Sequence, residues 1–506
     1  MELTRRGLFQ AGAAAVALYA LPRGSAARAA DSPFYSMAMH VHGSSSEGPA
    51  SWATQVASAK AAGVDVLWAS DHDWRMSAYQ FPTVVPVTKP SSPGFAAKNG
   101  SVTFSTAGMQ LGNAVAVFQA PRKQGEGNMA NLTIYIDVVL GAGESLACVV
   151  VGSKCPAAPN GSTARLQFTT SGSYSWQPSQ QVAGMSSDSA FSQLRIEGSG
   201  LVRSFRFDWG VTGDEPLMAQ VQVLDTLRAA NPGLSICQAL EVSLFDPHIN
   251  WFGGTLTLPD YASLPKNADD ATHAISDMIR ARGGIMSYNH MYGSHGNPVV
   301  TQQKELDVAS SVIAKRAYGA AILEVGYIRR AGATLRQHMH VWDICTRNGF
   351  YLAGNGVSDN HTGGDWWQGN NTFATCAWAT SPRKADLLSA ISARRLFGRK
   401  LGGGWNGWVD LAADGALMGT VSPSSGSRTV QVRVSAVPTG GSVTVLQVPI
   451  DYAGVRVTKP AVLATYRTTN VDSAVTVPSG NAVRVVLHNS GGQAVGFSNP
   501  IWMPAA

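Results

Sequence analysis

The fold class is indicated by the stretch Val64-Asp65-Val66-Leu67-Trp68-Ala69-Ser70-Asp71-His72-Asp73. Its apolar residues, 64–69, predict a buried strand, and three polar residues follow directly, as at strands that end at a ligand site. Similar apolar runs at 284–288, 320–325 and 350–354 alternate with helical stretches at 51–62, 271–282 and 335–348. Strand and helix in alternation predict an α/β fold of parallel βα units.

Two other parts of the chain have a β-rich pattern. Residues 85–217 are rich in Gly, Ser and Thr around alternating runs such as 132–139, 164–169 and 201–207. This pattern predicts an inserted antiparallel β-sandwich, so the α/β domain is discontinuous and comprises residues 31–84 and 218–404. Alternating runs return at 429–436, 442–448 and 482–488, which predicts a C-terminal β-sandwich-like domain over residues 405–506.

Composition places the chain among large folded proteins. It has 506 residues, of which 45% are hydrophobic and 14% charged, enough for two to four domains and unlike a disordered chain. The formal net charge is +6, and half of it belongs to the first 29 residues. So weak a positive charge argues against duplex nucleic acid as a partner.

The first residues have the pattern of an export signal. Thr4-Arg5-Arg6-Gly7-Leu8-Phe9 precedes the mildly apolar run 11–21 and then Ala27-Arg28-Ala29. This order predicts a twin-arginine (Tat) type signal peptide over residues 1–29, and hence a periplasmic or secreted bacterial protein. The run is about half of what a spanning helix needs, so we expect no transmembrane segment in the mature chain.

The five cysteines do not form a CxxC site. Cys148 and Cys155 are close enough in sequence to close a short disulfide loop, although free thiols are the alternative. Cys237, Cys345 and Cys376 lie in apolar stretches and are expected to be buried thiols.

Histidines beside carboxylates at predicted strand ends are the central observation. His40 and His42 in the segment His40-Val41-His42-Gly43-Ser44-Ser45-Ser46-Glu47-Gly48 point to the same side of a strand and can grip one cation, with Glu47 folding back as a further ligand. His72 is a candidate ligand, and Asp71 is expected to orient it or a neighbouring ligand.

Three further segments end in the same way. Ile236-Cys237-Gln238-Ala239-Leu240-Glu241 ends in a carboxylate that is our candidate for bridging two metals, and His248 follows. Residues 283–290 end in His290, and residues 353–361 end in Ser358-Asp359-Asn360-His361. Any one of these residues alone is more often a core or capping residue. Five such strand ends in one chain favour a metal site.

Taken in order, these motifs resemble those of the PHP (polymerase and histidinol phosphatase) superfamily, in particular the branch that includes carbaryl-type hydrolases. The resemblance rests on HxHxxxxEG, GVDVLWASDH, EVSLFDPHIN, GGIMSYNH and SDNH. It implies a distorted βα barrel that holds two to three divalent metal ions, usually zinc, manganese or iron.

The resemblance also implies a ligand set. The first metal would be held by His40, His42, Glu241 and Asp359, and Glu241 would bridge to a second metal held by His248 and His290. Glu47, His72 and His361 would hold a third. Two features depart from the family: Glu47 stands where Asp is common, and the long β-rich insertion separates His72 from Glu241.

Such a site predicts hydrolysis. Two cations that share a water lower its pKa towards neutrality, so a metal-bridging hydroxide forms, while a further cation holds anionic substrate oxygens. Arg75 is a candidate for contacting a phosphate oxygen. The catalytic candidates are Glu241, Asp71 and Arg75. Weaker candidates are Glu324, either as an extra ligand or as a residue that supports the ligands from behind, and residues 365–368, as an aromatic lip or as core. His338 and His340 are expected to be structural.

These expectations leave three functions open. The first is an exported metal-dependent phosphoesterase acting on a phosphorylated or ester-containing small molecule or envelope polymer. The second is an ester, amide or carbamate hydrolase of the carbaryl-hydrolase type. The third is a non-catalytic envelope binding protein, against which nine candidate ligands argue.

Overall fold

The computed structural model describes residues 33–506, except 44, 47–49, 74–82, 85–86, 90–94, 120–129, 131, 187–188, 190, 209–213, 262, 295, 364–365 and 367–371. The predicted signal peptide, Glu47 and Arg75 therefore lie outside the described residues.

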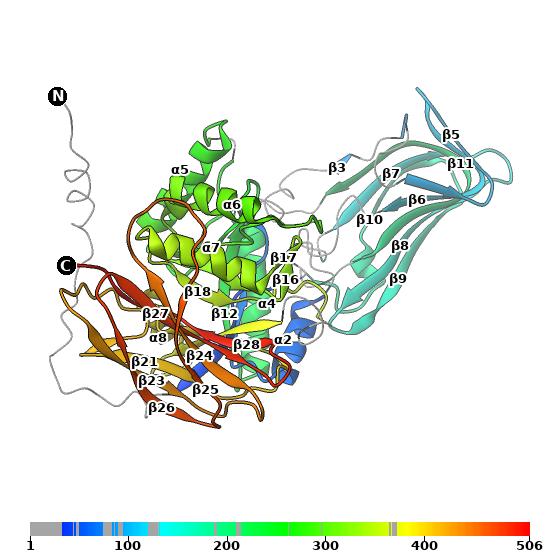
Figure 1. Cartoon of the computed structure of the whole chain (residues 1–506). Coiled ribbons are helices and arrows are strands. Elements are labelled where there is room, and N and C mark those ends of the chain that lie inside the picture. Colours follow the sequence, from blue (N-terminus) through cyan, green and yellow to red (C-terminus); the bar gives the residue numbers. More distant parts are fainter. Residues whose placement is uncertain are drawn as a thin grey trace, which may run out of the picture. The chain divides into compact units, whose positions relative to one another are not determined.

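The described part is a mixed α/β protein built on a large sheet (Figure 1). Nine neighbouring strands of that sheet form its α/β part, in the order β18-β15-β14-β13-β12-β2-β1-β19-β20. Neighbouring strands pair in parallel, except that β13 and β19 run antiparallel to both of their neighbours. Their bounds are β1 (Phe34–Ala38), β2 (Val66–Ala69), β12 (Ser235–Val242), β13 (Ile249–Phe252), β14 (Ile285–Tyr288), β15 (Ile322–Gly326), β18 (Ala353–Gly356), β19 (Phe373–Trp378) and β20 (Leu396–Lys400).

The sheet of the predicted distorted βα barrel does not close among the described residues. The strand order is an open path, and no backbone ladder joins β18 to the other side of the sheet. Side chains satisfy that edge instead: Thr375 Oγ1 accepts from Gly356 N at 3.1 Å and donates to Gly356 O at 2.8 Å. Asn499 does the same for Gly354, at 2.7 and 2.9 Å. Few backbone bonds cross this edge: Phe373 N donates to Val357 O at 3.2 Å, and Val41 pairs with Asn360 in an isolated bridge.

In the described part of the chain, six α-helices connect or flank these strands, and three of them correspond to the predicted helical stretches 51–62, 271–282 and 335–348. Several begin at side-chain caps: Ser51 accepts from Thr54 N, and Asn267 accepts from Asp269 N and Asp270 N. Thr334 and Gln337 form a reciprocal capping box at the start of α7. The helices are α2 (Trp52–Ala61), α4 (Glu215–Ala230), α5 (Ala268–Ala281), α6 (Gln302–Ala314), α7 (Leu335–Arg347) and α8 (Lys384–Ser392).

Eight strands of the predicted insertion, together with β3 just before it, form one antiparallel sheet with an apolar core of its own. Strand β11 is its longest member and pairs with β3, β6, β7 and β8. Side chains alternate in burial along β7, where Ile134, Ile136 and Val138 face the core. The strands are β3 (Thr83–Val84), β4 (Phe95–Lys98), β5 (Ser101–Ser105), β6 (Gly108–Gln119), β7 (Thr133–Val139), β8 (Leu146–Cys155), β9 (Ala158–Phe168), β10 (Gly172–Trp176) and β11 (Gln193–Asp208).

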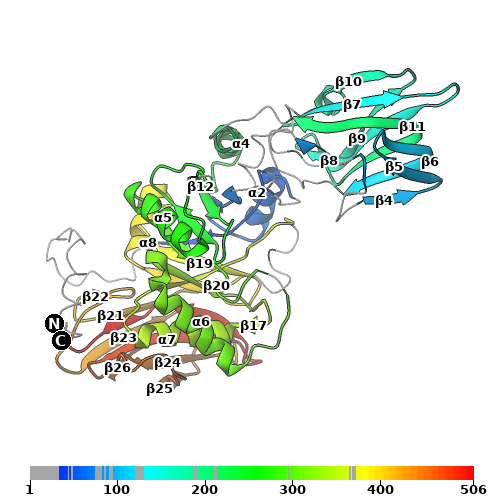
Figure 2. The same cartoon turned by 90° about the horizontal axis from the view of Figure 1, so that it is seen from above.

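The C-terminal strands extend the main sheet. Strand β28 pairs with β20, and the path continues through β27 and β24 to β25, with β29 also on β27. Figure 2 shows these strands beside α7. A second sheet, β22-β21-β23-β26, encloses a valine-rich core with them. The bounds are β21 (Val409–Ala413), β22 (Ala416–Leu417), β23 (Arg428–Val434), β24 (Ser442–Pro449), β25 (Ala461–Tyr466), β26 (Val471–Val477), β27 (Asn481–His488), β28 (Ala494–Ser498) and β29 (Ile501–Met503).

All five cysteines are free and buried, so the disulfide considered between Cys148 and Cys155 is not formed. Both residues lie on β8, and seven residues of extended strand separate their Cα atoms by about 23 Å. A disulfide needs Cα atoms within about 7 Å. None of the helices among the described residues has both the length and the apolar character needed to cross a membrane.

Candidate metal centre

The candidate ligands meet at one edge of the main sheet because several parallel strands end there. His40 and His42 follow β1, His72 follows β2, and Glu241 is the penultimate residue of β12. His290 follows β14, and Asp359 and His361 follow β18. His248 immediately precedes β13, whose antiparallel direction brings its start to the same edge.

Glu241 lies at the centre of the cluster and is fully buried. Its Oε1 is 3.1 Å from His248 Nδ1, 3.1 Å from His290 Nε2 and 3.2 Å from His40 Nε2. Its Oε2 is 2.8 Å from His72 Nδ1 and 3.3 Å from His42 Nε2. Each oxygen thus faces a different set of imidazoles, which is the arrangement a bridging carboxylate needs.

The HxH pair shares a second carboxylate with the end of β18. Asp359 Oδ1 is 3.3 Å from His40 Nε2 and 3.2 Å from His42 Nε2, and these two ring nitrogens are 3.0 Å apart. Two imidazole nitrogens that face each other and the same carboxylates are well placed to share one cation.

His42 also joins the residues predicted to hold a third metal. Its ring stacks on His361, with centroids 4.1 Å apart, and lies 4.5 Å from the ring of His72. These three histidines form one group whose ligand atoms lie within 4.8 Å of one another. Their predicted companion, Glu47, lies outside the described residues.

Glu324 is more closely involved than its sequence context indicated. Its Oε1 is 2.7 Å from His40 Nδ1, and its Oε2 accepts from His290 N at 2.8 Å and from the hydroxyl of Tyr327. Glu324 is fully buried at the centre of β15. It therefore fixes the orientation of one candidate ligand and the backbone of another, a role typical of residues behind a metal site.

Arg330 was not identified from the sequence. Its guanidinium, with a side chain 17% exposed, pairs with Asp359 Oδ2 from the two-residue strand β16 (Arg329–Arg330), which pairs with β17 (Ala333–Thr334). The only feature of the sequence that could have indicated this contact is that Arg330 comes soon after Glu324. The segment between β15 and α7 is too short to show a periodicity that would indicate where its side chains point.

The electrostatics of the cluster favour metal binding. Burial, together with His361 and His72, lowers the pKa of His42 to about 3, and burial also lowers the pKa of His290. Burial opposes charge on Glu241 and Asp359, yet neighbouring cationic groups hold the pKa of both carboxyls well below the usual range. Neutral imidazoles beside ionised carboxylates are the forms that ligate metals.

His40 behaves differently. Burial opposes its charge, but Glu241, Asp359 and Glu324 outweigh that effect and raise the pKa of His40 well above its usual value. A divalent cation among these carboxylates would supply the positive charge that a proton otherwise supplies.

The donor set fits divalent ions such as zinc, manganese or iron, which accept imidazole nitrogen and carboxylate oxygen. Besides the three-histidine group, three groups bring their ligand atoms within 4.8 Å of one another: His40 with His42 and Glu241, His72 with Glu241 and His248, and His40 with His290 and Glu324. The predicted companions His248 and His290 both contact Glu241, with His248 Nδ1 and His290 Nε2 each 3.1 Å from its Oε1, and their assignment to one metal stays a prediction.

Two candidate ligands have positive backbone φ angles. The φ of His290 is 24° and that of Asp359 is 45°, values that residues other than glycine seldom adopt. Such strain is common where a side chain must be aimed at a functional site.

Asp71 contacts the loop after His42. Its Oδ1 accepts from Gly43 N at 2.8 Å and Ser46 Oγ at 2.7 Å, and its Oδ2 from Trp52 Nε1 and Gln220 Nε2. It therefore positions the backbone that carries the HxH pair. A catalytic role for Asp71 and for Arg75, which lies outside the described residues, stays a prediction.

The remaining predicted features lie elsewhere. Trp366 is fully buried and donates to Gln55 Oε1 at 2.9 Å, so it is a core residue, whereas 365, 367 and 368 lie outside the described part of the chain. His340 contacts Glu305, and His338 donates to Thr334 O at 3.0 Å. Asn289, not singled out from the sequence, donates to Glu241 Oε1 at 2.8 Å.

Comparisons with known proteins add little to this geometry. No family model matches the chain, and no curated protein matches it. A two-domain protein from Bacteroides vulgatus, containing a predicted PHP-like metal-dependent phosphoesterase, is similar over 93% of this chain and 96% of its own, with 11% identity and a TM-score of 0.37. The ZmpB metallopeptidase from Clostridium perfringens covers 93% of this chain and 100% of its own, with 9% identity and a TM-score of 0.13. At these TM-scores neither likeness establishes a shared fold, and the carbaryl-hydrolase branch stays a prediction.

Proposed function

We propose that this protein is a metal-dependent hydrolase and that its substrates are phosphoesters. The observation that carries the proposal is the convergence of five histidines on the two oxygens of one buried carboxylate, Glu241. A structural ion pair needs one partner, not five. Several imidazole nitrogens around one carboxylate are typical of a metal site.

The carboxylates of the cluster have different roles. Glu241 and Asp359 bring negative charge to the HxH pair, and Glu324 holds His40 through its Nδ1 so that Nε2 faces the cluster. Bound divalent cations would polarise a water molecule and the substrate's oxygens. No covalent intermediate on the protein is required.

Arg330 favours an anionic substrate. Burial disfavours its charge, but Asp359 and other neighbouring acidic groups outweigh this and raise the pKa of Arg330, so the guanidinium stays charged beside the cluster. A guanidinium fork matches phosphate oxygens, to which it can donate two hydrogen bonds. A cation bound to Asp359 would weaken the ion pair between Asp359 and Arg330. The guanidinium could then donate hydrogen bonds to a phosphoryl group.

The second candidate is a hydrolase of neutral esters, amides or carbamates. The same cluster would polarise a neutral carbonyl, but such a substrate gains less from a charged guanidinium. A non-catalytic binding protein is a third candidate, which the dense donor set does not favour.

One experiment separates the three. The full mature chain is purified without chelator, its metals are measured by elemental analysis, and turnover is measured on 4-nitrophenyl phosphate, bis(4-nitrophenyl) phosphate, 4-nitrophenyl acetate and an aryl methylcarbamate. We expect two to three metal equivalents and preference for a phosphoester. Preference for the neutral substrates would replace the phosphoester proposal by the second candidate. Fewer than one equivalent after reconstitution with zinc, manganese and iron would contradict the hydrolase.

Export through the Tat system is part of the proposal and is supported by the twin arginines of the leader. A substrate outside the cytoplasm follows, either a phosphorylated small molecule or an envelope polymer. Fusion of residues 1–32 to a reporter that Tat alone exports would test it, with Arg5 and Arg6 replaced by Lys as the control.

A further inference from the structure

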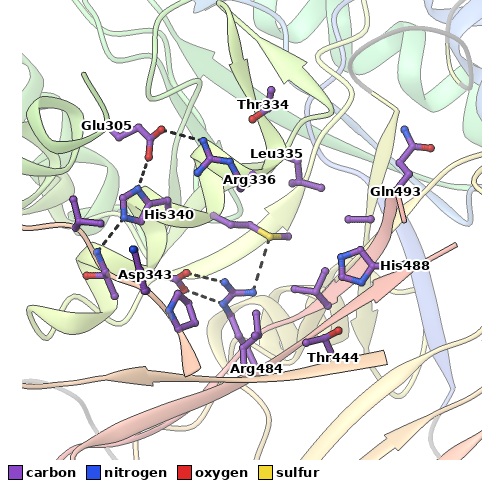
Figure 3. A pocket seen from close by; sticks show the side chains of 18 of the residues that line it. Glu305, Thr334, Leu335, Arg336, His340, Asp343, Thr444, Arg484, His488 and Gln493 are labelled. Atoms are coloured by element: carbon purple, nitrogen blue, oxygen red, sulfur yellow. Dashed lines mark hydrogen bonds and ion pairs between the residues drawn. The ribbon is translucent and has the colours of Figure 1, made fainter. Parts of the chain in front are cut away.

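A cavity of about 820 Å³ lies between α7 and the C-terminal strands β24 and β27 (Figure 3). Its described lining residues include none of the candidate metal ligands. The volume is within the range of sites that hold small organic ligands, about 300 to 1,000 Å³.

One side of the cavity is apolar. Leu335 and Met339 on α7 face Leu446 on β24 and Val486 on β27. Such side chains bind a hydrocarbon or aromatic body by removing its surface from water. The cavity therefore suits a ligand with an apolar part.

The floor of the cavity carries a buried guanidinium. The side chain of Arg484 is 3% exposed, and its Nε and Nη2 donate to the two oxygens of Asp343 at 2.9 and 2.7 Å. Its Nη1 contacts only the sulfur of Met339, at 4.0 Å, among its described hydrogen-bond partners. A thioether is a weak acceptor, so this nitrogen retains donor capacity for a stronger one.

The charges that line the cavity leave one cation in excess. Arg484 pairs with Asp343, and Arg336 lies 3.5 Å from Glu305. Lys459 is exposed at the cavity wall and has no hydrogen bond or ion pair in the described part of the protein. One anionic head group would therefore balance the cavity.

We propose that this cavity binds a small organic monoanion, such as a carboxylate or sulfonate, with an aromatic or aliphatic body. The body contacts the wall of Leu446 and Val486. The anionic head lies between Arg484 Nη1 and Lys459. The site is separate from the metal centre, so the proposal does not depend on the function proposed for that centre.

The test uses two fluorescent probes with the same body. 8-Anilinonaphthalene-1-sulfonate carries an anionic head, and N-phenyl-1-naphthylamine is the same ring system without it. Both are titrated into the metal-loaded full chain. We expect one saturable site per chain, with the anionic probe bound about tenfold more tightly because a charge-assisted contact is added.

Three variants locate the site. Lys459→Gln is expected to weaken the anionic probe about fivefold and leave the neutral probe unchanged. Leu446→Glu is expected to weaken the anionic probe at least about thirtyfold and the neutral probe about tenfold, because a carboxylate replaces apolar wall. Lys266→Gln removes the same charge from an exposed residue that does not line the cavity, and we expect no change.

The proposal is overturned by any of three results: no saturable site, anionic-probe binding within about twofold of wild type in folded Leu446→Glu, or equal weakening by Lys266→Gln and Lys459→Gln. If Leu446→Glu fails to fold, as judged by its melting transition, the two lysine variants decide the matter. Metal content is measured for each variant and is expected to be unchanged, as a separate site requires.

Discussion

Two buried groups of histidine and glutamate in this molecule contain the same kinds of side chain and differ in how their partners are shared. At the sheet edge, five imidazoles face the two oxygens of Glu241. The second group lies on α7, where His340 has one partner for each ring nitrogen. Its Nδ1 contacts Glu305, and its Nε2 accepts from Thr458 N at 3.1 Å.

This difference indicates what each group is for. Where every polar atom has its own protein partner, the group is complete and serves the fold. Where several nitrogens share one carboxylate, the ligands outnumber the protein partners, and cations complete the group. Residue type and burial alone would not separate the two.

The largest expected effect is from Glu241→Gln. The amide cannot supply two anionic oxygens, so we expect metal content to fall by at least one equivalent and turnover to fall about 10³-fold or more. Elemental analysis and steady-state kinetics measure the two. The variant should still fold, which a cooperative melting transition of the apoprotein would show, because the large apolar core does not depend on this residue.

A smaller effect is expected from Arg330→Met. If the guanidinium contacts a phosphoryl oxygen, kcat/KM for 4-nitrophenyl phosphate should fall about 10²-fold. Hydrolysis of 4-nitrophenyl acetate should stay within about threefold. Arg329→Met changes the exposed neighbour on the same strand and serves as the control. Equal losses on both substrates would place Arg330 in the support of Asp359 and not in contact with substrate.

Glu305→Gln is the matched counterpart of the first variant, since it makes the same change in the complete group. His340 and Arg336 lose their carboxylate partner, so we expect the free energy of unfolding to fall by about 3 kcal/mol. Chemical denaturation measures this loss. Metal content and turnover should stay within about twofold of wild type. Loss of metal in this variant would erase the distinction between the two groups.

Much of the fold follows from local patterns in the sequence. Apolar runs with turn residues around them located β14 and β15, and a helical stretch after the second of these runs located α7. The pairing of β28 with β20 could not be predicted, because alternating strands look the same in a separate sandwich and in an extension of the main sheet. The side-chain hydrogen bonds from Thr375 and Asn499 to the backbone of β18 could not be predicted either, because neither residue lies in a motif that indicates such a partner.

The site was predictable where chemistry and strand ends coincide. The HxH pair, Glu241 and Asp359 meet because parallel strands end at one edge, and their order along the chain indicated this. Arg330 was missed because a two-residue strand is too short to show the alternation of apolar and polar residues that would indicate where its side chains point. The pairing of His290 with Glu324 depends on a left-handed backbone turn at His290, which the sequence does not reveal for a residue other than glycine.

The smallest expected effect separates a buried histidine of the fold from the ligands by pH. Burial lowers the pKa of His338 to about 4, and its ring lies against Tyr292 and Tyr327. A folded-state pKa below the unfolded value of about 6.5 means that this contribution to stability is complete above pH 6.5 and is lost as the pH falls towards 4. Between pH 7 and pH 5, His338 should therefore account for about 2 kcal/mol of lost stability. In the chelated protein, His338→Gln should be less sensitive to acid by that amount in chemical denaturation, while metal binding by the untreated variant at pH 7 is retained. An unchanged pH dependence would show that His338 is solvated in the folded protein and that the acid sensitivity arises at the ligand histidines.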